Sequence, residues 1–247
     1  MTIAHLANRS YGGGIVEIQE TLGQNSAFTR YLITYPSETF NLYGFMNVPQ
    51  GDGPFPVAIV MHGYVSPERY STLTYTTRYA DALARAGYLV IHPNYRNWPP
   101  SDSGPDLFRV SHAVDTLNLI AIIREQAGKP GPLEMADAGF IGMMGHSMGG
   151  GITLRVITAN NLVDAAVLYG SMSGDERQNF EKILAWSGGA EGQTELAVAA
   201  EDLERIGPLY HLKRISVPVS IHHGENDGTT PLEWSLDLCD RLSLIHI

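Results

Sequence analysis

The stretch Phe140-Ile-Gly-Met-Met-Gly-His-Ser-Met-Gly-Gly-Gly-Ile-Thr-Leu154 decides the fold of this chain. A short apolar run leads into a serine flanked by glycines, and helical spacing follows, so we interpret the stretch as a strand, a sharp turn and a helix. Gly145-His-Ser-Met-Gly149 fits G-x-S-x-G, the nucleophile elbow, in which the serine lies on a strained turn and small neighbours let the backbone bend. The pattern predicts Ser147 as a nucleophile.

The same turn predicts half of an oxyanion hole. The Met148 N–H stands at the start of the following helix, where a backbone donor and the positive end of the helix dipole both favour negative charge. A glycine-rich turn that contains serine by chance is the alternative. The strand pattern before the turn and the helical pattern after it favour the nucleophile.

Length and composition predict one domain, over residues 1–247. With 44% hydrophobic residues the chain can bury one large core. The formal net charge is −10 and the 16 Lys and Arg residues are scattered, which argues against a nucleic-acid partner. Cys239 is the only cysteine, so no internal disulfide can form.

No apolar run approaches the roughly 20 residues that span a bilayer, so we expect no membrane span. The first residues lack a basic segment followed by a hydrophobic one. As written, the chain therefore carries no signal peptide, and we expect a cytoplasmic location if Met1 is the natural start. Nothing in the sequence indicates the oligomeric state.

Strand and helix patterns alternate along most of the chain. The apolar run 56–61 is typical of a strand buried on both faces. Antiparallel strands are expected first, then parallel strands alternating with helices: strands at 15–20, 28–35, 40–48, 56–61, 87–91, 138–145, 164–169 and 217–221, and helices at 72–86, 106–126, 148–159 and from Leu232. This order predicts an α/β fold with a doubly wound, mostly parallel sheet and antiparallel N-terminal strands.

Residues 171–209 interrupt this alternation. They carry Phe180 and Trp186, a flexible segment at 187–192, and a helical acidic run. Because a structureless connection of this length is improbable inside a compact domain, we predict an inserted helical lid whose two aromatic residues bind substrate. A surface excursion without function is the alternative.

The segment His222-His-Gly-Glu-Asn-Asp-Gly-Thr-Thr-Pro231 follows the last predicted strand and supplies an acid. A serine nucleophile needs a base to take its proton and a carboxylate to orient that base. Asp227 lies just past a late strand and after Ser147 in chain order, as this architecture requires. Glu225 is the local alternative, and a turn-forming role is the other interpretation of Asp227.

These segments resemble the α/β-hydrolases, and within them the prolyl-oligopeptidase-like and dienelactone-hydrolase-like branch. The resemblance runs from about Tyr35 to Leu242, and these motifs carry it: Gly53-Pro-Phe-Pro56, His62-Gly63, Asn94-Tyr-Arg96, Gly145-His-Ser-Met-Gly-Gly150, His223-Gly-Glu-Asn-Asp227 and Pro231. It implies Ser147 as nucleophile, Asp227 as triad acid and the Tyr64 N–H as the second oxyanion donor. It also implies that His62 orders the oxyanion loop.

The sequence departs from this family in one loop. The family usually continues Asn-Tyr-Arg with glycine, whereas this chain has Asn97-Trp98-Pro-Pro100. We therefore expect Trp98 to shape the mouth of the site and to contact substrate.

The second departure concerns the triad histidine. The family places it after a further helix and strand, which need roughly 20 residues. Only His246 follows Asp227, and residues 242–247, Leu-Ser-Leu-Ile-His-Ile, also read as a translated transposon end used in sequencing libraries. We therefore expect a non-native tail at 242–247, a truncated natural chain and low activity, with His246 as the candidate base within this sequence. His222 and His223 are interpreted as packing residues.

The resemblance implies a serine hydrolase that cleaves ester or amide bonds through an acyl-enzyme. Small carboxylic esters are favoured, because peptidase relatives often carry an N-terminal propeller and no such domain precedes Met1. The alternatives are a prolyl-oligopeptidase-type serine peptidase, a polyester or cutinase-like hydrolase, and a non-catalytic binding protein on the same fold. No cofactor is expected, since the sequence lacks H-E-x-x-H zinc spacing and a phosphate-cradling glycine loop.

Overall fold

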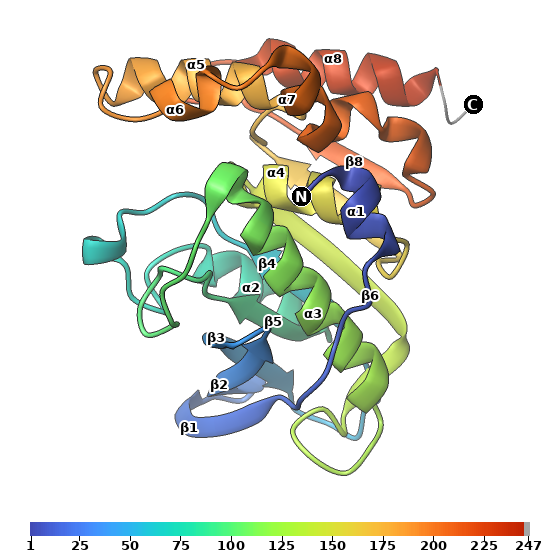
Figure 1. Cartoon of the computed structure of the whole chain (residues 1–247). Helices are drawn as coiled ribbons and strands as arrows, with labels where there is room; N and C mark the ends of the chain where they lie inside the picture. Colours follow the sequence, from blue (N-terminus) through green and yellow to red (C-terminus); the bar gives the residue numbers. More distant parts are fainter. Residues whose placement is uncertain (245–247) are drawn as a thin grey trace.

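A sheet of eight strands, in the order β1-β2-β3-β5-β4-β6-β7-β8, runs through the molecule. The fold is taken from a computed structural model of the chain, which describes residues 1–244 (Figure 1). The strands are β1 (Glu17–Gln24), β2 (Phe28–Ser37), β3 (Phe40–Pro49), β4 (Phe55–Met61), β5 (Leu89–Pro93), β6 (Ala136–His146), β7 (Ala165–Tyr169) and β8 (Val219–His222).

The sheet is antiparallel at its N-terminal edge and parallel elsewhere. Strands β1, β2 and β3 pair antiparallel, and β3 pairs antiparallel with β5. Strands β5, β4, β6, β7 and β8 pair in parallel. The predicted α/β sheet with antiparallel entry strands is therefore confirmed.

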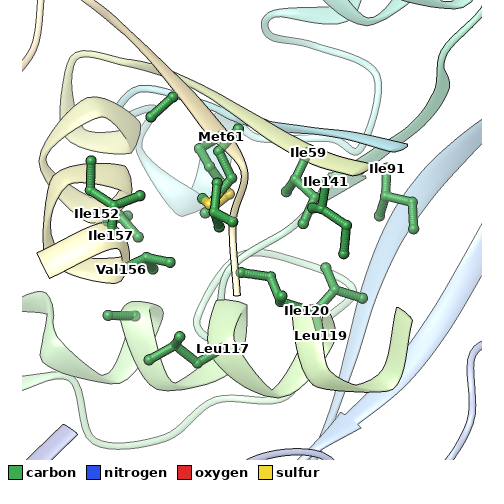
Figure 2. Packing of buried hydrophobic residues seen from close by; sticks show 14 of the residues in the cluster. Ile59, Met61, Ile91, Leu117, Leu119, Ile120, Ile141, Ile152, Val156 and Ile157 are labelled. Atoms are coloured by element: carbon green, nitrogen blue, oxygen red, sulfur yellow. The ribbon is translucent and has the colours of Figure 1, made fainter. Parts of the chain in front are cut away.

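Helices cover both faces of the sheet. They are α1 (Ile3–Asn8), α2 (Thr77–Arg85), α3 (Val110–Gln126), α4 (Met148–Ala159) and α8 (Leu232–Ser243). Val57, Ile59 and Met61 of β4 pack in the large core cluster with α3 and α4, whereas the alternate residues Ala58 and Val60 pack in a smaller cluster with α2. Figure 2 shows Ile59, Ile91 and Ile141 near Leu119 and Ile120 of α3. Because β4 is buried on both faces, its sequence is continuously apolar.

Two helices begin later than the sequence predicted. Helix α2 starts at Thr77 and not at residue 72, because Thr76 has a left-handed φ of 56°. Helix α3 starts at Val110 and not at residue 106, because Phe108 and Arg109 have φ values of 56° and 54°. A non-glycine residue with positive φ does not continue a right-handed helix. The first strand also lies later than predicted, at Glu17–Gln24.

Residues 171–209 lie between β7 and β8 and are called the insertion here. This segment contains α5 (Glu176–Trp186), α6 (Gln193–Leu196) and α7 (Ala200–Ile206), and a 3-10 turn, η3 (Pro208–Tyr210), begins at its end. Figure 1 shows these helices gathered with α8 at one end of the sheet. None of the helices within residues 1–244 has the length and apolar character that a bilayer crossing requires.

A buried ion pair fixes the insertion to the body of the protein. Arg155 of α4 donates from Nη2 to Glu176 Oε1 of α5, and the two side chains are only 2% and 4% exposed. Arg109 donates to the other oxygen of Glu176 at 3.1 Å. Burial lowers the pKa of Arg155 and the carboxylate of Glu176 counteracts that effect. Because neither charge is hydrated, each depends on its partner.

We expect Glu176→Gln to lower the free energy of unfolding by about 3 kcal/mol, because it leaves a buried guanidinium without a counterion. Urea unfolding followed by circular dichroism measures this change. Glu181→Gln is the matched control, since Glu181 lies on the same helix and is exposed. Equal losses in the two variants would show that the ion pair does not anchor the insertion.

Candidate active site

Ser147 lies on a strained turn between β6 and α4, as predicted. Its φ of 53° and ψ of −117° are rarely adopted by a residue with a side chain. Hydrogen bonds hold the turn in place. The Ser147 N–H donates to the Tyr169 carbonyl at 3.0 Å, and the Ser147 carbonyl accepts from Gly150 N at 2.9 Å and Met172 N at 3.1 Å. The backbone is thus fixed by the neighbouring strand β7 and by α4.

Glycines allow α4 to begin directly against the ends of the strands. A Cβ atom at Gly149 would lie 2.3 Å from the Met61 carbonyl oxygen of β4. A Cβ atom at Gly145 would lie 2.3 Å from the Gly149 carbonyl oxygen. Both contacts are to backbone, so neither can be relieved by turning a side chain. This close approach is the physical reason for glycine on each side of Ser147.

The residues predicted to supply the oxyanion donors follow Ser147 directly or lie on the loop beside it. Met148 is the first residue of α4, where backbone N–H groups lack helical partners and the dipole favours an anion. Tyr64 follows the end of β4 through Gly63, and a Cβ atom at Gly63 would lie 3.2 Å from Ser147 Cβ. The loop that carries the Tyr64 N–H therefore passes directly by the nucleophile.

His62 supports that loop from inside the protein. Its ring is fully buried and stacks on Tyr70 and Tyr95, with centroid distances of 4.8 Å and 4.1 Å. Burial holds the pKa of His62 well below its usual value, so the imidazole is neutral. Tyr95 donates its hydroxyl to the His62 carbonyl at 2.7 Å. These contacts fix the backbone just before Gly63, in agreement with the role that the family resemblance implies.

Asp227 is held as a carboxylate near the end of β7. Its Oδ1 accepts from Thr229 N at 2.8 Å and Thr230 N at 3.0 Å, and its Oδ2 accepts from Thr230 Oγ1 at 2.9 Å. Burial alone raises the pKa of Asp227, but these hydrogen bonds outweigh it, and the pKa lies below its usual value. A Cβ atom at Gly170, next to Tyr169, would lie 3.2 Å from Asp227 Oδ2.

The described histidines near Asp227 make their hydrogen bonds with other groups, and His223 Nε2 lies 3.8 Å from Asp227 Oδ2. His223 has Nδ1 2.7 Å from Ser235 Oγ and Nε2 2.9 Å from the Thr230 carbonyl, so it is the packing residue that we predicted. His222 is exposed and was predicted wrongly, because β8 is the outermost strand and one of its faces is open. His246, the candidate base, lies outside the described residues.

His146 is adjacent to the nucleophile and is not placed as its base. Its Nδ1 lies 2.9 Å from the Tyr75 hydroxyl, and its ring packs between Tyr75 and Tyr169. Burial lowers the pKa of His146, and the negative charge of Asp227 partly counteracts this. No imidazole within residues 1–244 makes hydrogen bonds to both the Ser147 hydroxyl and Asp227.

A cavity of about 980 Å³ brings the predicted residues together. The predicted site residues that line it are Tyr64, Trp98, Ser147, Met148, Phe180, Trp186 and Asp227. Trp98 is nearly buried and donates its ring N–H to the Val65 carbonyl at 2.7 Å, so it also supports the loop after Tyr64. Glu225, the alternative acid, does not line the cavity.

Sequence reasoning missed many residues of the cavity wall, and four of them come from two irregular segments. Tyr75 reaches it from the loop before α2, and Asp106, Phe108 and Arg109 reach it from the irregular start of α3. A positive φ at Phe108 and Arg109 has no sequence signal, because neither residue is glycine or asparagine. Within residues 1–244, no three His, Cys, Asp or Glu side chains gather as a metal ion requires.

The strand order, the serine turn after β6 and the carboxylate beyond β8 define a protein of the α/β-hydrolase superfamily. The sequence profile of the Dienelactone hydrolase family matches residues 42–242. The chain belongs to this family. Members of this family are hydrolases, and both the fold and the family match group this chain with them.

Solved structures show the same fold. Acetyl xylan esterase 1 from Thermoanaerobacterium sp. has a TM-score of 0.68 and 18% identity, and the match covers 93% of this chain and 78% of the esterase. The Pyrococcus horikoshii acylaminoacyl peptidase has a TM-score of 0.70 and 22% identity, over 90% of this chain and 36% of the peptidase. A Pyrococcus furiosus esterase has a TM-score of 0.67 and 15% identity, and the match covers 96% of this chain and 86% of that esterase. The chain thus spans about a third of the peptidase.

We expect Gly149→Ala to destabilise the protein by roughly 1–3 kcal/mol, because its Cβ atom would meet the Met61 carbonyl. Alanine in a helix otherwise stabilises by about 1 kcal/mol relative to glycine, so the sign of the change is diagnostic. Gly151→Ala in the same helix is the control, since its Cβ atom would meet only the Met172 side chain, at 3.3 Å. Thermal unfolding should show the larger loss for Gly149→Ala, and the reverse order would argue against close backbone packing at the turn.

Proposed function

We propose that this protein is a serine hydrolase that cleaves carboxylic esters or amides through an acyl-enzyme, with small esters as its favoured substrates. One observation carries the proposal. Ser147 occupies a strained turn at the N-terminus of α4, inside a cavity that Asp227 also lines. Membership in the Dienelactone hydrolase family supports the same chemistry.

In the proposed reaction, Ser147 Oγ attacks the carbonyl carbon of the substrate and forms a C–O bond, while the hydroxyl proton passes to a histidine. The N–H groups of Met148 and Tyr64 stabilise the resulting oxyanion. The tetrahedral intermediate collapses as the bond to the alcohol or amine breaks, and this group leaves with the proton. Water then gives a proton to the histidine, attacks the acyl-enzyme and releases the acid, and the proton returns to Ser147.

Asp227 is proposed to orient the histidine and to stabilise its protonated form. A carboxylate with a lowered pKa suits this role, because it stays charged throughout the cycle. His246, which lies outside the described residues, is the proposed histidine. If it is the base, His246→Ala abolishes Ser147-dependent turnover, and turnover that survives the replacement rejects this assignment.

A peptidase is the second candidate function. The similarity to an acylaminoacyl peptidase favours it, although that protein is much longer than this chain. The same nucleophile and oxyanion donors serve an ester or an amide, so turnover of p-nitrophenyl butyrate against an amino-acyl p-nitroanilide distinguishes the two. A polyester substrate is tested by the same assay with a polyester film.

A fluorophosphonate probe should label Ser147 when the triad histidine is in place, because the proposed nucleophile lines the cavity together with the residues of the proposed oxyanion donors. Peptide mapping by mass spectrometry locates the adduct, and Ser147→Ala should remove it without changing the circular dichroism spectrum. Ser216→Ala is the control, since Ser216 is exposed away from the cavity. Labelling at another residue, or no labelling of folded protein, would reject Ser147 as an activated nucleophile.

The acid is tested in the same assay. We expect Asp227→Asn to slow labelling by about a hundredfold or more, because the neutral amide favours the wrong histidine tautomer. The Glu225→Gln variant should be labelled at the wild-type rate, since Glu225 is exposed and outside the cavity. The opposite pattern would assign the acid to Glu225.

Phe180 and Trp186 of the insertion are proposed to bind the acyl group, together with Trp98. We expect Trp186→Ala to change the ratio of octanoate to butyrate hydrolysis by at least about threefold, because the ring lines the cavity and each methylene contributes to discrimination. Stability should change little, as Trp186 is 47% exposed. Trp234→Ala on α8 is the control, and equal effects of the two variants on this ratio would exclude the lid role.

A further inference from the structure

Carboxylates outnumber cations on the cavity wall. Asp106, Glu191, Glu195 and Asp227 line it, and Arg109 is its one Lys or Arg among the described residues. Arg109 is already engaged, since its guanidinium pairs with Glu176 at 3.1 Å and lies 4.8 Å from the centroid of the Phe180 ring. Among the described residues that line the wall, no Lys or Arg is left without a carboxylate partner.

Two of the four carboxylates are engaged by neighbours. Asp106 lies 2.8 Å from His112 Nε2, and Asp227 accepts the hydrogen bonds of its own loop. Glu191 and Glu195 differ, because neither forms an ion pair within residues 1–244. Both belong to the insertion, between α5 and the end of α6, so the unpaired charge faces the proposed acyl pocket.

The charge of Glu191 also acts on Tyr64, which lies on the predicted oxyanion loop after β4. Burial raises the pKa of Tyr64, and the negative charge of Glu191 raises it further. Both residues line the cavity, so the carboxylate of Glu191 and the Tyr64 side chain belong to the same wall. A charged group on a bound substrate would experience the same field, because it would occupy the space between these residues.

Aromatic rings line the same cavity. Tyr64 and Trp98 meet edge to face with centroids 6.0 Å apart, and Trp186 lies on the insertion side. Lys182 of α5 places its Nζ 5.8 Å from the Trp186 ring centroid, so one face of this ring already holds a cation. Aromatic faces and carboxylates together attract cations and repel anions. His146 adds no charge here, because burial lowers its pKa.

From this arrangement we propose that the cavity selects esters or amides that carry a cationic group, and rejects those that carry a carboxylate. Glu191 and Glu195 are the specificity-determining residues. The inference rests on the proposed function for its substrate class, but the charge preference itself is a binding property. The formal net charge of −10 acts in the same direction by steering cations toward the protein.

The binding test uses three ligands of nearly equal shape: benzamidinium, benzamide and benzoate. In the Ser147→Ala protein, which needs no chemistry, we expect tryptophan fluorescence to give the affinity order cation, neutral, anion. The ratio of cation to anion affinity should be about tenfold at low salt and should fall toward one in about 0.5 M NaCl. Equal affinities, absence of cation binding or preference for benzoate would overturn the proposal.

The variant test compares two double replacements with equal change of net charge. Glu191→Gln with Glu195→Gln should lower the cation-to-anion ratio by about threefold to tenfold. Glu17→Gln with Glu20→Gln should leave it unchanged, because these residues are exposed on β1 at the far edge of the sheet. Equal shifts in both would assign the preference to overall charge and overturn the role of the insertion.

Turnover extends the test to reaction. The p-nitrophenyl esters of 4-amidinobenzoic, 4-carbamoylbenzoic and terephthalic acid differ in charge and little in shape. Each ester is compared between wild type and the Glu191/Glu195 variant, so that differences in intrinsic reactivity cancel. Absence of Ser147-dependent turnover of the neutral ester would reject the proposed function, whereas turnover without charge preference would reject only the present inference.

Discussion

The structure depends on how closely α4 approaches the end of β4. The Met61 carbonyl lies where a side chain on the first turn of α4 would have to be, so the helix can begin at Met148 only if residue 149 is glycine. That contact forces the chain to turn sharply at Ser147 and fixes its backbone with a positive φ. The hydrogen bond from Ser147 N to the Tyr169 carbonyl then ties the turn to β7. The position of the candidate nucleophile is therefore a property of sheet and helix packing and does not depend on a flexible loop.

Sequence reasoning succeeded where the signal is local. The apolar run of β4, the glycines around Ser147 and the position of Asp227 after β8 each reflect a constraint that acts over a few residues. Their meeting in one cavity follows from parallel strands whose carboxyl ends share an edge of the sheet. This is why Ser147 and Asp227 could be placed together although 80 positions separate them by their numbers.

The missed features all depend on contacts between distant segments. Thr76 leaves the helical conformation while its hydroxyl lies against His92, a residue of the neighbouring strand. Phe108 adopts a positive φ where its ring meets Phe180 of the insertion, edge to face at 5.6 Å. The sequence around Arg155 predicts an ordinary exposed position on a helix. The side chain is instead buried, because the insertion covers it. No local pattern of residues encodes such burial. Propensities of single residues therefore predict helix starts that are too early and an exposed Arg155.

The ion pair between Arg155 and Glu176 also bears on how substrate would enter. Swinging α5 away from α4 would separate two charges that are both shielded from water, which makes such a hinge motion costly. The middle of the insertion is anchored less firmly, since Trp186 and Glu191 are exposed. Both residues also line the cavity, so a substrate that enters beside this part of the insertion could reach Ser147 while α5 stays in place. In that case the dimensions of the cavity entrance, and not the movement of α5, would set the upper size of the substrates.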